Sequence, residues 1–306
     1  MSRQVGDGAV LDRQRGWVDR LPPRLRDLAV LARWDRPIGS WLLLLPCWWG
    51  LALAPAAPSP WLYLLFAVGA VAMRGAGCTV NDLADREFDR RVERTRNRPL
   101  AAGRIGTAGA VAFFAVQSAV GLAVLAALPR VAALVALASV PLVLLYPFAK
   151  RVTWWPQAVL GITFNWGALV AYAAATGGID AAALLLYAAG VFWTLGYDTV
   201  YAHQDKADDI RVGVRSTALR LGAASRIWIG GFYGVMLLLL AASGRAAGLG
   251  WPFYPLLALP GLMLAWQVAR VDLDDRISCL RHFRFHREIG LAVLVALWAG
   301  RLFTAS

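Results

Sequence analysis

The chain has 306 residues, of which 59% are hydrophobic and only 16% are charged, yet its formal net charge is +12. Soluble domains average about 45–50% apolar and about 25% charged residues, so this composition excludes a disordered chain and argues against an ordinary soluble enzyme. It predicts an all-α, polytopic membrane protein whose positive charge belongs either to loops on one side of the membrane or to a nucleic-acid-binding surface.

The first 36 residues form a polar, arginine-rich segment ahead of the first long hydrophobic stretch. This segment contains no short apolar core of the kind found in a cleavable signal peptide. Its basic run is interrupted by Asp7, Asp12, Asp19 and Asp27, which argues against a mitochondrial transit peptide. We therefore expect the protein to lie in a bacterial inner membrane rather than in the mitochondrial inner membrane. We expect its N-terminal segment to be cytoplasmic.

Eight stretches with little or no charge are long enough to cross about 30 Å of hydrocarbon, which takes about 20 helical residues. The first stretch, 37–73, is divided by PAAPSP at 55–60, so it predicts two helices joined by a tight turn. The others are 105–129, 131–149, 152–176, 181–201, 227–244, 250–269 and 287–304. We expect nine transmembrane helices in a single integral-membrane domain over residues 1–306.

The basic residues of the chain are concentrated on one side of these predicted helices. All but four of the 31 Lys and Arg residues fall in the N-terminal segment and in the loops after helices 2, 4, 6 and 8. Cytoplasmic loops carry such an excess, so these loops and the N-terminus are predicted to be cytoplasmic. The positive charge then reflects topology, and we expect a lipid bilayer and no nucleic acid as partner.

An acidic motif lies in the charged sequence at 74–100, RGAGCTVNDLADREFDRRVERTRNRPL. Asn81, Asp85 and Asp89 are four residues apart, which places them on one helix face, and Asp82 lies near the same stripe. Stacked carboxylates repel each other unless a cation neutralises them. Oxygen ligands with no His or Cys nearby favour Mg²⁺ over Zn²⁺.

A second acidic motif ends another predicted span on the same side, in GYDTVYAHQDKADDI at 196–210. Asp205 and Asp209 are again four residues apart. Mg²⁺ usually binds a few carboxylates together with phosphate oxygens of a substrate, so two such clusters predict a site for Mg²⁺ and a diphosphate. The alternative is a solvated, salt-bridged loop, which two motifs at equal depth make less plausible.

Both motifs are preceded by a deeper charge at the same spacing. Arg74 lies seven residues before Asn81, and Asp198 lies seven residues before Asp205. At about 1.5 Å per residue, each deep charge lies about 10 Å below the expected metal ligands. A charge at that depth is normally paired or functional. Two interpretations stay open: a structural ion pair between Arg74 and Asp198, or an anionic substrate bound by Arg74.

Several blocks of the sequence resemble the UbiA superfamily of membrane prenyltransferases, most closely its branch that acts on 4-hydroxybenzoate in ubiquinone biosynthesis. RWDRPIG at 33–39 is similar to the opening motif of that branch, and NDLADREFD at 81–89 fits its NDxxDxxxD pattern. Further blocks match at 146–167, which begins YPFAKR, and at 197–218, which begins YDTVYA. NDxxDxxxD is shared with haem farnesyltransferases, whereas the other blocks together are more specific.

The resemblance implies nine helices around a central cavity and a Mg²⁺-dependent reaction of a polyprenyl diphosphate with 4-hydroxybenzoate, at the ring position ortho to the hydroxyl. The metal ligands that it implies are Asn81, Asp85, Asp205 and Asp209. Asp89, on the same helix face as Asn81 and Asp85, is predicted as a further ligand. Another acceptor, such as haem, is an alternative. A transporter is a further alternative, although transporters tend to place ionisable residues near the midplane of the membrane.

Roles follow for the residues around the two motifs. Cations that neutralise the diphosphate make it a better leaving group, and the expected diphosphate ligands are Arg36, Lys150, Arg151 and Lys206. We expect catalysis to depend on Asp85, Asp205 and Arg151. The allylic cation needs aromatic faces and protection from water, and the residues expected around it and the acceptor are Arg74, Asp198, Tyr197 and Tyr201.

Two other residue pairs have weaker signals. His282 and His286 are four residues apart, but no acidic or Cys ligand completes a metal site, so we expect a pair at the cytoplasmic interface. By resemblance, Asn97 and Arg98 are expected to help order the loop after the second helix as a lid.

Overall fold

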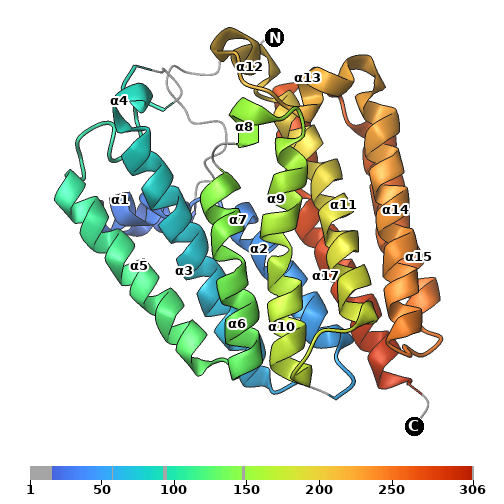
Figure 1. Ribbon diagram of the computed structural model, residues 1–306. Coiled ribbons are helices and arrows are strands. Elements are labelled where there is room, and N and C mark those ends of the chain that lie inside the picture. Colours follow the sequence, from blue (N-terminus) through green and yellow to red (C-terminus); the bar gives the residue numbers. More distant parts are fainter. Residues whose placement is uncertain (1–15, 57, 92–94, 147–148, 305–306) are drawn as a thin grey trace. The chain divides into compact units, whose positions relative to one another are not determined.

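The computed structural model describes residues 16–56, 58–91, 95–146 and 149–304, and every regular element within them is a helix (Figure 1). The N-terminal segment contains a 3₁₀ turn, η1 (Trp17–Arg20), and the short helix α1 (Pro23–Leu31). The expectation of an all-α fold is confirmed.

Each predicted span corresponds to one helix or to two consecutive helices in the described part of the chain. These are α2 (Ile38–Leu53), α3 (Pro60–Ala84), α5 (Thr107–Ala127), α6 (Arg130–Ala138) with α7 (Val140–Leu145), α9 (Pro156–Phe164) with α10 (Trp166–Thr176), α11 (Ala181–His203), α14 (Ser225–Ala246), α15 (Phe253–Arg270) and α17 (His286–Leu302). Among the described residues, 5 helical stretches are long and apolar enough to cross a membrane. The number nine therefore stays a prediction.

Short helices occupy the basic loops. They are α4 (Arg86–Asp89), α8 (Ala149–Val152), α12 (Lys206–Val212), α13 (Thr217–Leu221) with the 3₁₀ turn η3 (Gly222–Ala224), and α16 (Arg276–Arg284). Two of them, α4 and α12, belong to the two acidic motifs. The motifs thus lie at the ends of long helices, where the chain leaves its apolar segments.

The chain divides into two compact units, each of which is described by itself. Unit 1 comprises Met1–Trp41 and Ala67–Ala127, and unit 2 comprises Leu42–Phe66 and Leu128–Ser306. The first acidic motif belongs to unit 1 and the second to unit 2. The single domain over residues 1–306 stays a prediction.

In unit 1, α3 packs against α5. A buried hydroxyl, Thr79 Oγ1, donates to Gln117 Oε1 of α5 at 3.1 Å. Near the basic loop, Leu31 at the end of α1 forms an apolar cluster with Leu100 and Ile105. This cluster joins the N-terminal segment to the loop that follows α4, so both segments have fixed positions beside the first motif.

In unit 2, α11 is the central helix and packs against α9, α14 and α16 (Figure 1). Buried side chains link it to α14 and α17: Trp193 Nε1 donates to His286 Nδ1 at 2.8 Å, and His286 Nε2 lies 3.1 Å from Tyr233 Oη. An indole nitrogen can only donate, so His286 Nδ1 must accept and Nε2 carries the proton. In a cationic imidazole Nδ1 would also carry a proton, and this N–H would point at the N–H of Trp193. The contact therefore requires a neutral imidazole.

The burial of this network bears on the predicted histidine pair. His286 is 0% exposed and His282 is 6% exposed, so both imidazoles lie in the protein interior. Their expected depth, at the cytoplasmic interface of the membrane, stays a prediction. Trp193 on α11 donates to His286 and Tyr233 on α14 accepts from it. The sequence separates both residues from His286 by many positions, so it gives no sign of this buried contact.

The close approach of α11 and α14 depends on Gly196. A Cβ atom at this position would lie 2.1 Å from the ring of Tyr233. We expect Gly196→Ala to lower the free energy of unfolding by about 1–3 kcal/mol, the usual cost of overpacking. Thermal unfolding of the purified protein in detergent measures this change.

Gly234→Ala on α14 is the matched control, because a Cβ atom there meets nothing within 4 Å. Alanine is favoured over glycine inside helices by about 0.5–1 kcal/mol, so this variant should be as stable as the wild type or more stable. Equal effects of the two substitutions would contradict the packing argument.

Candidate active site

The first acidic motif spans the junction of α3 and α4. Its helical hydrogen bonds continue through the junction, since Asp85 N donates to Asn81 O at 2.9 Å and Asp89 N donates to Asp85 O at 2.8 Å. The three residues therefore lie on successive helical turns, as their spacing predicts.

Burial divides the motif into two pairs. Asn81 and Asp85 are exposed, whereas Asp82 and Asp89 are only 1% and 3% exposed. Seven residues make nearly two full helical turns, so Asp82 and Asp89 share one stripe. The exposed pair lies about 40–100° around the helix from the two buried residues.

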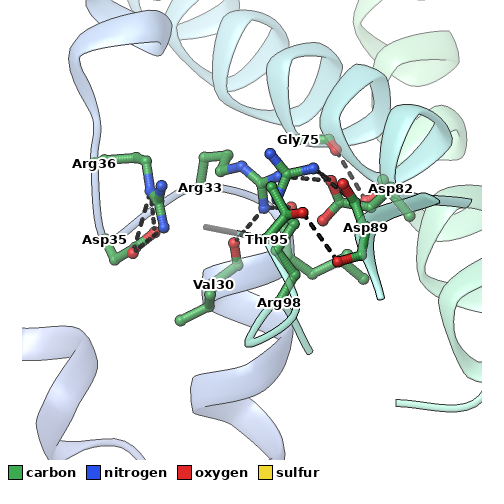
Figure 2. Close-up of polar contacts among 11 residues, drawn as sticks. Val30, Arg33, Asp35, Arg36, Gly75, Asp82, Asp89, Thr95 and Arg98 are labelled. Carbon is green, nitrogen blue, oxygen red and sulfur yellow. Dashed lines mark hydrogen bonds and ion pairs between the residues drawn. The ribbon is translucent and has the colours of Figure 1, made fainter. Parts of the chain in front are cut away.

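The buried pair is held by arginines from two other segments (Figure 2). Arg33 Nη2 donates to Asp82 Oδ1 at 2.6 Å. Arg98 Nη1 donates to the same oxygen at 3.1 Å and to Asp89 Oδ2 at 2.8 Å. Burial lowers the pKa of Arg33, but Asp82, Cys78 and Asp35 together outweigh it and raise this pKa above its ordinary value. We term these four residues, Arg33, Asp82, Asp89 and Arg98, the charged brace.

Asp89 was predicted as a metal ligand, and the structure places its carboxylate against Arg98. Its ligand role stays a prediction. Arg98 was expected to order the loop after the second helix, and it does connect that loop to the motif through two ion pairs.

Arg36 is oriented by its neighbour. Its guanidinium donates to Asp35, with Nη2 3.1 Å from Oδ2, and its side chain remains 18% exposed. Asp35 is only 3% exposed. Arg36 is thus held in place with part of its surface open, which is compatible with its predicted contact to a diphosphate.

Arg74 lies against the backbone of Gly39, the glycine of the RPIG block. A Cβ atom at position 39 would lie 2.6 Å from Arg74 Nε, so only glycine leaves room for this side chain. Arg74 is half-buried. Arg74 and Asp198 belong to different units, and both interpretations of this pair stay predictions.

The second motif lies at the junction of α11 and α12. Asp205 precedes α12, and Asp209 N donates to Asp205 O at 2.7 Å, so the two carboxylates are one helical turn apart. Both are half-buried, as is Lys206. The helix ends at Gly213 with a left-handed φ of 74°, a conformation that favours glycine.

The two predicted tyrosines differ in burial. Tyr197 is 1% exposed and accepts a hydrogen bond at 3.1 Å from Thr194 Oγ1. Tyr201 is half-buried, with its ring centroid 4.4 Å from that of Phe283. Asp198 between them is also half-buried. Tyr201 is therefore the more accessible aromatic face beside the second motif.

The helix α8 carries the predicted basic pair. Arg151 is exposed, and the side chain of Lys150 lies outside the described residues. Arg215, which the sequence did not single out, donates to Val152 O at 2.8 Å and lies 5.5 Å from the ring centroid of Trp154. It therefore links the end of α8 to the segment before α13.

The exposed oxygens of the first motif suit Mg²⁺. Asn81 and Asp85 offer an amide and a carboxylate oxygen one turn apart, and Mg²⁺ typically takes one or two protein carboxylates with waters and substrate phosphates. Within the described part of the chain, no group of three or more His, Cys, Asp or Glu residues forms a complete metal site. The exposed oxygens of Asn81 and Asp85 suit a metal that is shared with a diphosphate.

The family model described as the UbiA prenyltransferase family matches residues 43–289. The chain belongs to this family. Several curated relatives are also similar. "4-Hydroxybenzoate polyprenyltransferase, mitochondrial" from Arabidopsis thaliana is 43% identical over 98% of this chain and 75% of the relative. The protein of the same description from Aedes aegypti is 46% identical over 90% of this chain and 63% of its own length.

Solved structures of UbiA proteins share the fold. A UbiA homologue from Aeropyrum pernix K1 matches with a TM-score of 0.67 and 27% identity, over 86% of this chain and 96% of that chain. A UbiA homologue from Archaeoglobus fulgidus, bound to GPP and Mg²⁺, matches with a TM-score of 0.64 and 19% identity, over 89% of this chain and 99% of that chain. The expectations of the family and of a UbiA-like fold are confirmed.

The expected bacterial inner membrane is wrong. The curated UbiA relatives named above are mitochondrial proteins of a plant and an insect, and they favour the mitochondrial inner membrane. The expectation rested on the aspartates that interrupt the basic run of the N-terminal segment. The charge pattern of that segment carries little information about which membrane holds the protein.

The contact of Arg74 with Gly39 gives a test. We expect Gly39→Ala to displace the guanidinium and to lower the rate of prenyl transfer about 10- to 100-fold, because small misplacements at a reacting centre have effects of this size. Gly77→Ala, where a Cβ atom meets nothing within 4 Å, is the control and should retain the wild-type rate. A full rate in Gly39→Ala would show that the position of Arg74 is unimportant.

Proposed function

We propose that this protein transfers a polyprenyl group from a polyprenyl diphosphate to 4-hydroxybenzoate, as a step of ubiquinone biosynthesis. The observation that carries the proposal is similarity to 4-hydroxybenzoate polyprenyltransferases over nearly the whole chain, at 43–46% identity for the plant and insect proteins. The exposed Asn81 and Asp85 supply the chemistry that a Mg²⁺-dependent member of this family needs.

The reaction breaks the bond between the first carbon of the polyprenyl chain and the diphosphate oxygen. A new carbon–carbon bond forms at the ring position ortho to the hydroxyl, the ring loses a proton there, and diphosphate is released. Since the acceptor is a phenol, its hydroxyl makes the ortho carbon electron-rich enough to attack an allylic cation.

Mg²⁺ is proposed to bind Asn81 and Asp85 in the first motif and Asp205 and Asp209 in the second. When bound, Mg²⁺ neutralises the diphosphate and makes it a better leaving group. Asp85 and Asp205 are proposed as the catalytic carboxylates because each belongs to an oxygen pair one helical turn apart. Asp89 stays a candidate ligand whose carboxylate already has Arg98 as a neighbour.

The diphosphate is proposed to contact Arg36, Lys150, Arg151 and Lys206. Arg36 is pre-oriented by Asp35, so little side-chain entropy is lost when an anion binds. Arg151 is exposed on α8, and Arg215 supports the end of this short helix through the carbonyl of Val152. These contacts would hold the departing anion while the organic cation reacts.

The organic cation is proposed to lie beside Tyr201 and Asp198, and Arg74 is proposed to bind the carboxylate of 4-hydroxybenzoate. An aromatic face stabilises a cation without reacting with it. Tyr197 is proposed to support Tyr201 indirectly. Its buried ring packs against Phe283, with ring centroids 5.8 Å apart, and Phe283 in turn packs against Tyr201.

The decisive experiment uses membranes that contain the protein, together with 4-hydroxybenzoate, a polyprenyl diphosphate and Mg²⁺. We expect 3-polyprenyl-4-hydroxybenzoate, detected by mass spectrometry, and its loss when EDTA is added. Failure to form this product with any prenyl chain length would overturn the proposal. If a product forms only with another acceptor, the protein is still a prenyltransferase, but 4-hydroxybenzoate is not its substrate.

Asp85→Asn tests the assigned metal ligand. This change keeps the size of the side chain and removes its charge, so we expect product formation to fall at least about 100-fold, as for loss of strong transition-state stabilisation. Glu87→Gln is the matched control. It removes an exposed carboxylate only two residues away, whose partner in the structure is Arg90 at 2.9 Å, and activity should be unchanged. Equal activities of the two variants would remove Asp85 from the site.

A further inference from the structure

The end of α1 has an unusual backbone. Arg33 has a φ of 62° and is the one non-glycine residue with positive φ among those the structure describes. Its amide donates to Val30 O at 3.1 Å, and the next amide, of Trp34, donates to Ala29 O at 2.9 Å. This pair of bonds is a Schellman motif, in which glycine is the usual residue at the left-handed position.

The side chain of Arg33 makes two contacts from this strained backbone position. Its Nη1 donates to Val30 O at 3.0 Å, and its Nη2 donates to Asp82 Oδ1 at 2.6 Å. One guanidinium thereby caps α1 and binds the last turn of α3. Strained residues persist where the surrounding structure requires them, often at functional sites.

Asp82 receives a second guanidinium from the loop after α4. Arg98 reaches both Asp82 and Asp89, and its own loop is tied back to α4 because Thr95 Oγ1 donates to Asp89 O at 3.0 Å. Two separate segments thus converge on a single carboxylate oxygen (Figure 2). A buried charge held in this way has little freedom to rotate.

We propose that Asp82 is a positioning residue for the metal-binding motif, and that Arg33 and Arg98 act through it. With Asp82 held inward, helical geometry turns Asn81 and Asp85 outward, and these two are the exposed members of the motif. The inference rests on the proposed function, because the ligands that it positions are those of the proposed Mg²⁺–diphosphate site.

Two measurements on the full-length protein in detergent test the brace. The first is hydrogen–deuterium exchange of residues 30–36 and 95–104 without Mg²⁺ or substrate. The second is the Mg²⁺ concentration that gives half-maximal prenyl transfer, determined separately from kcat. We expect Asp82→Asn to speed exchange in both segments at least about 10-fold and to raise the Mg²⁺ requirement at least about 10-fold.

Arg33→Gly separates the brace from a simple helix cap. Glycine relieves the left-handed backbone but removes the guanidinium. If Arg33 only ended α1, this variant would be at least as stable as the wild type and would keep its Mg²⁺ requirement. The brace instead predicts faster exchange in residues 30–36 and a raised Mg²⁺ requirement. Asp82→Asn added to Arg33→Gly should have a smaller effect than Asp82→Asn alone, because the Arg33–Asp82 pair is already lost and only the Arg98–Asp82 pair remains to be weakened.

Arg104→Gln is the matched control. It breaks the pair of Arg104 with Asp27, at 2.9 Å, which joins α1 to the loop after α4 without touching the acidic motif. Its Mg²⁺ requirement should stay within about 2-fold of the wild type, because the arginine of this pair is 43% exposed and the pair does not contact the motif. If Asp82→Asn fails to fold, Arg98→Gln, on a side chain that is 28% exposed, provides the same test.

Wild-type exchange and a wild-type Mg²⁺ requirement in both Asp82→Asn and Arg33→Gly would overturn the brace. An equal rise of the Mg²⁺ requirement in Arg104→Gln would also overturn it, since any loosening of the loop would then suffice. If the wild type forms no prenylated product, the proposed function fails, and the exchange measurements still decide whether the brace orders the two segments.

Discussion

A carboxylate that leaves water at the end of a membrane helix needs a cation beside it, and the first unit is organised around this requirement. Moving an unpaired ion into a poorly solvated interior costs several kcal/mol even after relaxation. In the described residues, the buried aspartates are Asp27, Asp35, Asp82 and Asp89, and each is paired with an arginine. The pairs tie α1, the end of α3 and the loop after α4 together, so the same charges that are costly to bury also shape the first motif.

The ion pairs give the basic residues a second role. In the sequence, the number of arginines in the N-terminal segment and in the loop after α4 predicts the orientation of the helices in the membrane. In the structure, several of them neutralise buried acids, whereas Asn81 and Asp85 are exposed. Arg33 and Arg98, which belong to the basic segments used to predict topology, therefore also hold the buried acids of the first motif.

In the second unit, the buried polar contacts between the long helices are made by neutral groups. Trp193, Tyr233 and His286 join three long helices through hydrogen bonds, and the donor-only indole keeps the imidazole uncharged. Buried polar groups that are fully hydrogen-bonded define a single arrangement of the helices around them. The helix that carries the second motif, α11, is thus held by packing and neutral hydrogen bonds, whereas the first motif is held by ion pairs.

The sequence by itself determined the helical class, the stretches that become helices, the family and the two acidic motifs, because these depend on local periodicity, composition and spacing. Residue spacing also anticipated that Asn81, Asp85 and Asp89 would follow successive turns. It could not distinguish the exposed stripe from the buried one, since that choice depends on Arg33, 49 residues away from Asp82. Only the tertiary structure decided which carboxylates are braced and which are open, because burial and charge pairing arise when distant segments meet.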